Sequence, residues 1–511
     1  MIMCKHCNSE IMPREKYCKT CGSETPENMS DRISLENSLK IKLSLYLLIS
    51  ATGFTYLVLP QNAGVSVPVF VMLQFVCLCF IAPRKKPLLM FIPIFIISLN
   101  SFISANTMWR TPNLIVSCIL YSVMALMLTG SFSLTEPSSR LFSRTIKQVF
   151  NPFRYFTEPV KWAFDASKQH RALSTGTALR VLIALIISVP CLAVLLALLS
   201  SADAIFSNNV SAFFNAIYDV INVTAFAKML CGIIVGFYLF GLVYPVFQPV
   251  SETTSAKKKR NGDLLILNIL LILILVVYTI FVVIQFKYLF ANSSALPYGL
   301  TYTYYARRGF FELLLLTGLN ITLILITTWL TRGRVGSWAY LTKVLSCYLC
   351  AVTMVLLISS FYRMWLYNAD DGLTRLRFMV FGFLIFEAIG LLFTFIHIFV
   401  PKFNIIAVYA CIALVYYLAL NVVPMDSIIA KDQIDRYFET GRGGITYVVS
   451  ALSADAASQV ARLKDIDDNM TGLNAGHYFT RISAGYETHV PHWQSWNLSI
   501  TRFNNQLASI K

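Results

Sequence analysis

The chain has 511 residues, of which 56% are hydrophobic and 13% are charged, and its formal net charge at pH 7 is +16. Soluble domains are about 45–50% apolar and about 25% charged, so water is excluded as the solvent for most of this chain. The basic residues gather in connections between apolar stretches, which makes nucleic acid the least favoured partner.

The N-terminal head is rich in cysteine. Cys4, Cys7, Cys18 and Cys21 form two Cys-x2-Cys pairs. Two such pairs supply four thiolates at the spacing that tetrahedral Zn²⁺ requires, and a segment this short lacks an apolar core of its own. We therefore expect residues 1–24 to be a zinc ribbon with a structural Zn²⁺, and 25–40 to be a linker. The segment resembles the zinc-ribbon heads of many bacterial and archaeal membrane proteins, and is a candidate docking site for a protein partner.

Eleven apolar stretches follow, most of them close to the length of about 20 residues that crosses a bilayer as a helix. The sequence thus predicts an all-α polytopic membrane protein with about 11 transmembrane helices and the lipid bilayer as its main partner. The transmembrane domain extends over 41–423, and its spans are predicted at 41–60, 67–82, 88–105, 113–131, 181–200, 223–248, 263–285, 309–331, 338–360, 376–399 and 404–423.

Lysine and arginine follow the even-numbered stretches, as at 84–86, 257–260 and 332–334. The positive-inside rule assigns these connections to the cytoplasm. No removable signal peptide is evident, so we expect a multi-pass protein of the cell membrane with a cytoplasmic N-terminus. An odd number of spans then leaves 424–511 as an extracytoplasmic tail, in which short helices are predicted over 426–439, 445–453 and 454–464.

A long connection over 132–180 interleaves basic and aromatic residues, among them Arg144, Lys147, Phe153 and Trp162. This pattern is typical of an amphipathic helix lying on an anionic lipid leaflet. The alternative is a helix packed under the bundle with its basic side chains in water. We expect this segment to be cytoplasmic in either case.

Arginines and carboxylates also gather at the predicted outer surface. One group lies near the span 309–331 and the other before the span 376–399; together they are Arg307, Arg308, Glu312, Arg363, Asp370, Asp371 and Arg375. Arginine binds phosphate and carboxylate groups bidentately, so the cluster is a candidate anion site. A network of salt bridges that joins two loops is the alternative.

The stretches Tyr304–Leu313 and Leu366–Arg377 contain Tyr-Tyr-Ala-Arg-Arg-Gly-Phe-Phe-Glu-Leu and Leu-Tyr-x4-Gly-Leu-Thr-Arg-Leu-Arg. They resemble the signature of a bacterial family of polytopic membrane proteins, domain of unknown function 4173, which is related to domain 4153. The resemblance implies the fold and the topology, and it brings no reaction, cofactor or substrate.

Glu387 is the one acid near the middle of a clearly apolar stretch. Ionisable groups at this depth are costly and usually face a partner or a cavity. Glu387 is therefore a candidate for ion or proton coupling. The alternative is a protonated acid that is hydrogen-bonded to a neighbouring helix through Asn320.

Three functions fit these features. The favoured one is a membrane sensor, scaffold or regulator with the zinc ribbon on the cytoplasmic side. A transporter or channel for an anionic or proton-coupled solute is the alternative. The third is an enzyme of envelope lipids or glycans, with Asp370 or Asp371 as base. The sequence contains no specific catalytic signature, so no catalytic residue is assigned.

Overall fold

The computed structural model describes residues 2–3, 10–11, 37–59, 64–130, 138–168, 192, 195, 199, 201, 203, 223–248, 263–289, 310–401, 403–464, 469–486 and 492–510. The four cysteines of the predicted zinc ribbon, Arg307, Arg308 and nearly all of the predicted span 181–200 lie outside these residues.

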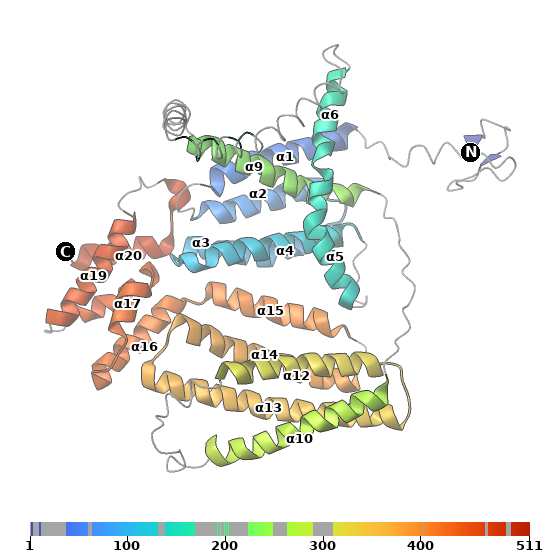
Figure 1. Ribbon diagram of the computed structural model, residues 1–511. Coiled ribbons are helices and arrows are strands. Elements are labelled where there is room, and N and C mark those ends of the chain that lie inside the picture. The colour runs from blue at the N-terminus through green and yellow to red at the C-terminus, as the bar shows by residue number, and fades with distance from the viewer. Residues whose placement is uncertain are drawn as a thin grey trace. The chain divides into compact units, whose positions relative to one another are not determined.

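The described residues form helices, their connections and one pair of short strands (Figure 1). The strands β1 (Ile2–Met3) and β2 (Glu10–Ile11) pair antiparallel, with Ile2 opposite Ile11. The chain divides into two compact units: Met1–Thr52 with Asn151–Ser251, and Gly53–Phe150 with Glu252–Lys511. The helix α1 (Asn37–Leu57) begins in the first unit and ends in the second.

The first unit also holds η4 (Asn151–Tyr155), α6 (Thr157–Lys168), α9 (Val223–Val243) and η5 (Tyr244–Phe247). Aromatic side chains join them. The rings of Phe153 and Tyr238 are 5.9 Å apart, and the Trp162 ring lies 5.6 Å from that of Phe240. These aromatic residues of the predicted amphipathic segment therefore pack on an apolar helix.

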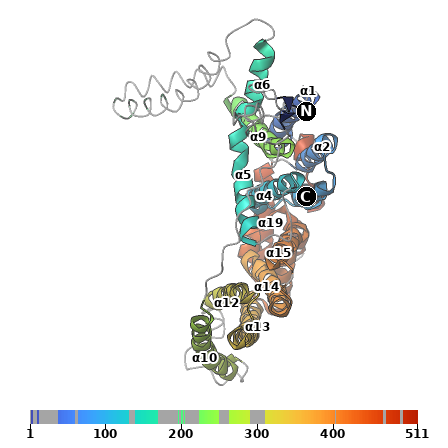
Figure 2. The same ribbon diagram turned by 90° about the vertical axis from the view of Figure 1, so that its right-hand side faces the viewer.

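The second unit contains most of the long helices. Its elements before the tail are α2 (Ser66–Ile81), η2 (Lys86–Met90), α3 (Phe91–Ile103), η3 (Thr107–Trp109), α4 (Arg110–Leu128), α5 (Ser138–Phe150), α10 (Leu264–Leu289), α12 (Phe310–Thr331), α13 (Ser337–Asp371), α14 (Arg375–Phe399) and α15 (Ile405–Val422). Figures 1 and 2 show α10, α12, α13 and α14 side by side, as their mutual contacts require. Leu271, Ile324, Leu349 and Leu391 form a core among these four helices.

Eight helices within the described residues are long and apolar enough to cross a bilayer. They coincide with eight of the predicted spans, so the helical membrane architecture is confirmed while the count of 11 is not. The predicted span 67–82 is the 16-residue apolar helix α2. The predicted span 41–60 is α1, which is less apolar because it carries Lys40 and Lys42.

Residues 138–150 of the predicted cytoplasmic segment form α5, which packs against α4 and α15. Ile146, Lys147 and Phe150 are exposed on this helix, whereas Gln148 is buried. The segment thus shares features of both alternatives: part of it packs on the bundle, and a basic and apolar face stays uncovered.

The tail forms a small helical layer at one end of the spans of the second unit (Figure 1). It consists of α16 (Met425–Thr440), α17 (Ile445–Ala451), η7 (Ala454–Ala456), α18 (Ala457–Val460), η8 (Ala461–Leu463), α19 (Asn469–Tyr486), η9 (Trp493–Ser495) and α20 (Leu498–Ile510). The first three predicted tail helices lie within two residues of these bounds, since amphipathic periodicity is a local signal.

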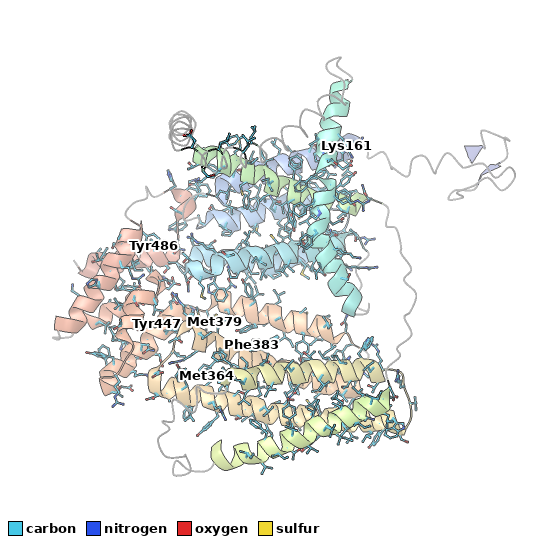
Figure 3. All side chains as sticks on the ribbon, in the orientation of Figure 1. Lys161, Met364, Met379, Phe383, Tyr447 and Tyr486 are labelled. Carbon is cyan, nitrogen blue, oxygen red and sulfur yellow. The ribbon has the colours of Figure 1, made fainter. Side chains whose placement is uncertain are left out.

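One apolar core joins the tail to the spans. Ile429, Val448, Tyr478 and Phe503 of the tail are completely or almost completely buried together with Trp109, which precedes α4. Met379 of α14 and Tyr447 of α17, both labelled in Figure 3, pack against the same core. The tail is therefore part of the second unit, which contains seven of the eight candidate spans among the described residues.

Close helix packing yields a first testable prediction. A Cβ atom added at Gly390 of α14 would lie 2.5 Å from Cε1 and 3.0 Å from the hydroxyl oxygen of Tyr409 on α15. We expect Gly390→Ala to displace this ring, break its 2.8 Å hydrogen bond to Thr394 and cost about 1–3 kcal/mol of stability. Thermal unfolding in detergent measures the loss.

Gly318→Ala on α12 is the matched control, because its nearest neighbour would lie at an ordinary 3.8 Å. Equal midpoints for the Gly390 variant and the wild type would contradict the prediction.

Candidate functional site

Asp426 is the centre of a buried polar network at the junction between the spans and the tail. It lies in the first turn of α16, and its side chain is fully buried. Arg375 Nε donates to Oδ1 at 2.7 Å, and Arg375 Nη2 donates to Oδ2 at 2.5 Å. The Ser453 amide and hydroxyl donate to Oδ2 at 2.9 and 2.6 Å. This bidentate geometry is the strongest that an arginine and a carboxylate form.

Asp455 joins the tail to a different pair of spans. Its carboxylate accepts a 2.5 Å hydrogen bond from the Ser104 hydroxyl and a 2.8 Å bond from the Ala105 amide, in the connection between α3 and η3. Asn497 adds bonds from its Nδ2 to the carbonyl oxygens of Ser101 and Ser104 at 2.9 and 2.8 Å. We call Asp426, Arg375, Ser453, Asp455, Ser104 and Asn497 the tail–span network.

Arg377 lies in the first turn of α14 and is buried. Its guanidinium donates to the Gly372 carbonyl oxygen and, at 3.0 Å, to Asp371 Oδ2. It also lies 3.8 Å from the centre of the Tyr367 ring. Gly372 has a φ of 74°, which glycine adopts without strain, and the Gln433 amide occupies the space where a side chain would extend.

A cavity of about 270 Å³ adjoins this arginine. It lies between α12, α13 and α14 and is lined by Phe310, Phe311, Met364, Tyr367, Thr374, Leu376 and Arg377. The lining is mostly apolar, with one guanidinium already engaged by Asp371 and the Gly372 carbonyl oxygen. Among the described residues, the lining of the cavity contains no carboxylate.

The structure distributes the predicted outer cluster over several partners. Helix α13 continues to Asp371, so Arg363 and Asp370 belong to a helix and not to a loop. Arg363 is buried, Glu312 and Asp370 are exposed, and Asp371 is paired with Arg377. Arg375 pairs with Asp426 of the tail, which the sequence did not suggest.

Glu387 is buried on α14 and accepts a 2.8 Å hydrogen bond from the Thr317 hydroxyl of α12. Asn320, the predicted partner, instead accepts a bond from the Tyr278 hydroxyl at 2.8 Å. The prediction of a hydrogen bond to a neighbouring helix is thus correct, while the residue is wrong. Thr317 and Asn320 are three positions apart and share one helix face.

Further buried polar side chains continue from this point through the core of α10, α12, α13 and α14. Thr342 donates to Asn268 Oδ1 at 2.7 Å, and the Thr327 and Ser346 hydroxyls are 3.0 Å apart. We call these buried side chains, together with the half-buried Tyr278, the polar seam; its members are Asn268, Tyr278, Thr317, Asn320, Thr327, Thr342, Ser346, Thr353, Ser360 and Glu387. Hydroxyl and amide side chains of this kind commonly join helices in membranes.

The sequence offered little signal for the tail–span network. Asp426 follows Pro424 at a helix start, where an acid is expected for its interaction with the helix dipole alone. Nothing in the spacing pairs it with Arg375, 51 residues earlier, or Asp455 with Ser104, 351 residues earlier. Among the described residues no three His, Cys, Asp or Glu side chains are grouped to hold a metal ion.

The environment of Tyr478 predicts how the stability of the tail–span network depends on pH. Its hydroxyl donates to the Ser453 carbonyl oxygen at 2.6 Å, and burial raises the pKa of the phenol well above its ordinary value. In the unfolded chain a tyrosine ionises near pH 10, whereas Tyr478 in the folded protein is still neutral at that pH. The contribution of neutral Tyr478 to the free energy of unfolding is therefore complete below about pH 10 and is lost as the pH rises beyond it.

We expect Tyr478→Phe to lower the thermal midpoint at pH 8, since it leaves a carbonyl oxygen without its donor, and to flatten the decline between pH 9.5 and 11. The exposed Tyr340 is the control position, where Phe should leave both quantities unchanged. An identical alkaline decline in wild type and Tyr478→Phe would show that another group causes it.

These observations define a multi-pass membrane protein of apolar helices with a helical domain fixed to the span ends. The chain belongs to the family described as Domain of unknown function (DUF4153), whose sequence profile matches residues 91–463. The match covers the arginines that were predicted at the outer surface, and also Glu387, Asp426 and Asp455. Neither a curated protein nor a solved structure matches the chain. The resemblance to domain 4173 stays a prediction.

Proposed function

We propose that the protein is a membrane scaffold or sensor that holds its tail in a fixed position at the outer ends of the spans. The observation that carries this proposal is the complete burial of Asp426 between Arg375 of α14 and Ser453 of the tail. A buried carboxylate with four good donors is a rigid connection, because loss of any partner leaves a charge desolvated.

The composition of the tail surface supports a role in presenting a binding face. Phe438 of α16 is 45% exposed. Trp493 and Trp496 are 51 and 55% exposed, and their rings lie beside Tyr56 of α1 and Phe102 of α3. Aromatic residues are enriched in protein interfaces. The tail would thus offer a partner a surface whose position is set by the spans.

A structural zinc ribbon would give the scaffold a second contact site at the other end of the chain. The pairing of Ile2 with Ile11 and of Met3 with Glu10 supports it, since this hairpin brackets the segment that contains Cys4 and Cys7. A ribbon with four thiolates leaves no open coordination position, so its role would be docking and not catalysis.

Proton-coupled transport is the second candidate, and the polar seam favours it. Glu387 is a buried ionisable group among the polar side chains of this seam, as expected for a proton route. The hydroxyl of Thr317 already satisfies one oxygen of Glu387, and many seam hydroxyls bond to their own helix. Hydroxyl groups bonded in this way are equally typical of helices that only pack together. We therefore prefer the scaffold to the transporter.

One pair of measurements separates the candidates. The full chain is reconstituted into liposomes that contain a pH-sensitive dye, and proton flux is followed for wild type and Glu387→Gln. A scaffold gives no flux above empty liposomes in either case. Flux in the wild type that disappears in Glu387→Gln would overturn the scaffold proposal in favour of transport.

The positive test places a photo-crosslinking amino acid at Phe438 of the full chain in its native cells. We expect one dominant cross-linked protein, which is lost in Asp426→Ala because the tail moves and is kept in Asp435→Ala. The control position is suitable because Asp435 pairs with Arg462 at the surface of the same unit. A pattern without any dominant cross-linked protein would count against the scaffold.

A further inference from the structure

An open groove lies between α2 and α3 in the second unit. Its volume is about 460 Å³, and its walls include Met72 and Phe75 of α2, Phe91 and Ile92 of α3, and Lys85 and Leu89 at one end. We call it the α2–α3 groove. Its volume falls within the range of about 300–1,000 Å³ that is typical of small-molecule sites.

The floor of the groove is rigid and apolar. The rings of Phe75 and Phe91 meet edge to face with their centres 5.4 Å apart, and Phe91 meets Tyr121 of α4 in the same way at 5.7 Å. Phe91 and Leu88 are buried, so the floor is fixed by packing behind it. A fixed apolar trough binds a flexible chain without having to reorganise itself first.

The rim of the groove is open on the side away from the core. Met72, Leu89 and Ile92 are 45, 67 and 57% exposed, although all three are apolar. Residues 86–103 form one of the eight apolar segments long enough to span a bilayer, so this exposed face lies against lipid. The matching occupant is therefore an acyl chain.

The groove has a basic end. Lys85 lines the cavity itself, and Lys86 follows at the first position of η2, with both side chains exposed. The neighbouring Arg84 guanidinium lies against Gly130 at the end of α4, which leaves the two lysines to face the headgroup region. Charge distribution places this connection on the cytoplasmic side, where the leaflet is anionic.

We propose that the α2–α3 groove binds one anionic phospholipid, with an acyl chain along Phe75, Phe91 and Ile92 and its phosphate against Lys85. The lysine distinguishes this lipid from a neutral one, because a headgroup without net charge gains less from a nearby ammonium group. This site is separate from the exposed basic face of α5, and it does not depend on the scaffold function proposed above.

The test uses the purified full chain, stripped of lipid in detergent and offered phosphatidylglycerol or phosphatidylcholine in equal amounts. Native mass spectrometry counts the lipid that stays bound. Lys85→Gln should reduce retained phosphatidylglycerol about fivefold, the effect of one lysine at an anionic surface, and leave phosphatidylcholine unchanged. Ile92→Trp, which fills the groove from an exposed position, should reduce both lipids.

Lys431→Gln on α16 is the matched control, because Lys431 is an exposed lysine of the same unit outside both the groove and α5. We expect this variant to retain phosphatidylglycerol like the wild type. Equal losses of phosphatidylglycerol in Lys85→Gln and Lys431→Gln would show an effect of general surface charge and overturn the proposal. Unchanged retention in Lys85→Gln would overturn it as well.

Discussion

Asp426→Ala will lower the free energy of unfolding of the second unit by about 3–5 kcal/mol, the usual cost of removing one partner of a buried ion pair. The change leaves Arg375 without its bidentate acceptor and deprives the Ser453 amide and hydroxyl of theirs. We expect the tail to separate from the span ends before the spans themselves unfold, because the spans keep their own packing in lipid.

Limited proteolysis of the full chain in nanodiscs measures this effect, with cleavage between α15 and α16 as the readout. Asp435→Ala is the matched control on the same helix: Asp435 and Arg462 are 35 and 40% exposed, and such surface pairs contribute about 0–1 kcal/mol. Equal cleavage rates for the two variants would show that Asp426 does not hold the tail.

The double variant Asp426→Leu with Arg375→Met refines the interpretation. Buried ion pairs can often be replaced by apolar residues at little cost, whereas single removals are expensive. If the large effect of Asp426→Ala comes from the uncompensated guanidinium, the double variant will recover part of the protection. No recovery would instead assign the effect to the lost bonds of Ser453.

Cys21→Ser will abolish zinc binding by the N-terminal head. Structural Zn²⁺ sites contribute about 10–16 kcal/mol of apparent binding free energy, and a ribbon of this length has no other core to fold around. Purified wild-type protein should contain stoichiometric zinc by elemental analysis, and Cys21→Ser should contain almost none. The effect is the largest predicted for any single side chain of this protein.

Cys411→Ser is the control for zinc, since Cys411 is an exposed thiol of α15 far from the ribbon in sequence. It should leave the zinc content unchanged. Zinc-free wild-type protein with two disulfides among Cys4, Cys7, Cys18 and Cys21 would contradict the ribbon. Chelator treatment of the wild type should release the metal without loosening the tail.

Much of the fold could be predicted, because helix length and apolar content are properties of neighbouring residues. Eight predicted spans correspond to helices of the right length, and α16 begins within one residue of the predicted helix start. The prediction was less accurate for the span 338–360, because the helix extends eleven residues beyond its predicted end. Helix α13 continues to Asp371 because no glycine or proline interrupts it before Gly372.

The candidate site was predictable in its residue types but not in its pairings. Arg375, Asp371 and Glu387 were singled out from the sequence, and each has a specific polar partner. The partners are Asp426, Arg377 and Thr317, and each of them lies on a different helix from the residue with which it pairs. A hydroxyl in a span gives no sequence signal that separates a partner of Glu387 from a residue bonded to its own helix.

The sequence by itself determined that lipid is the solvent for most of this protein and that the protein is helical. Both properties follow from the length and composition of uninterrupted apolar stretches. Only the tertiary structure decided that the tail is fixed to the spans through Asp426 and Asp455. The reason is physical: the partners are 51 and 351 residues apart in the chain. Their approach depends on how α3, α14 and α16 pack, which no local pattern encodes.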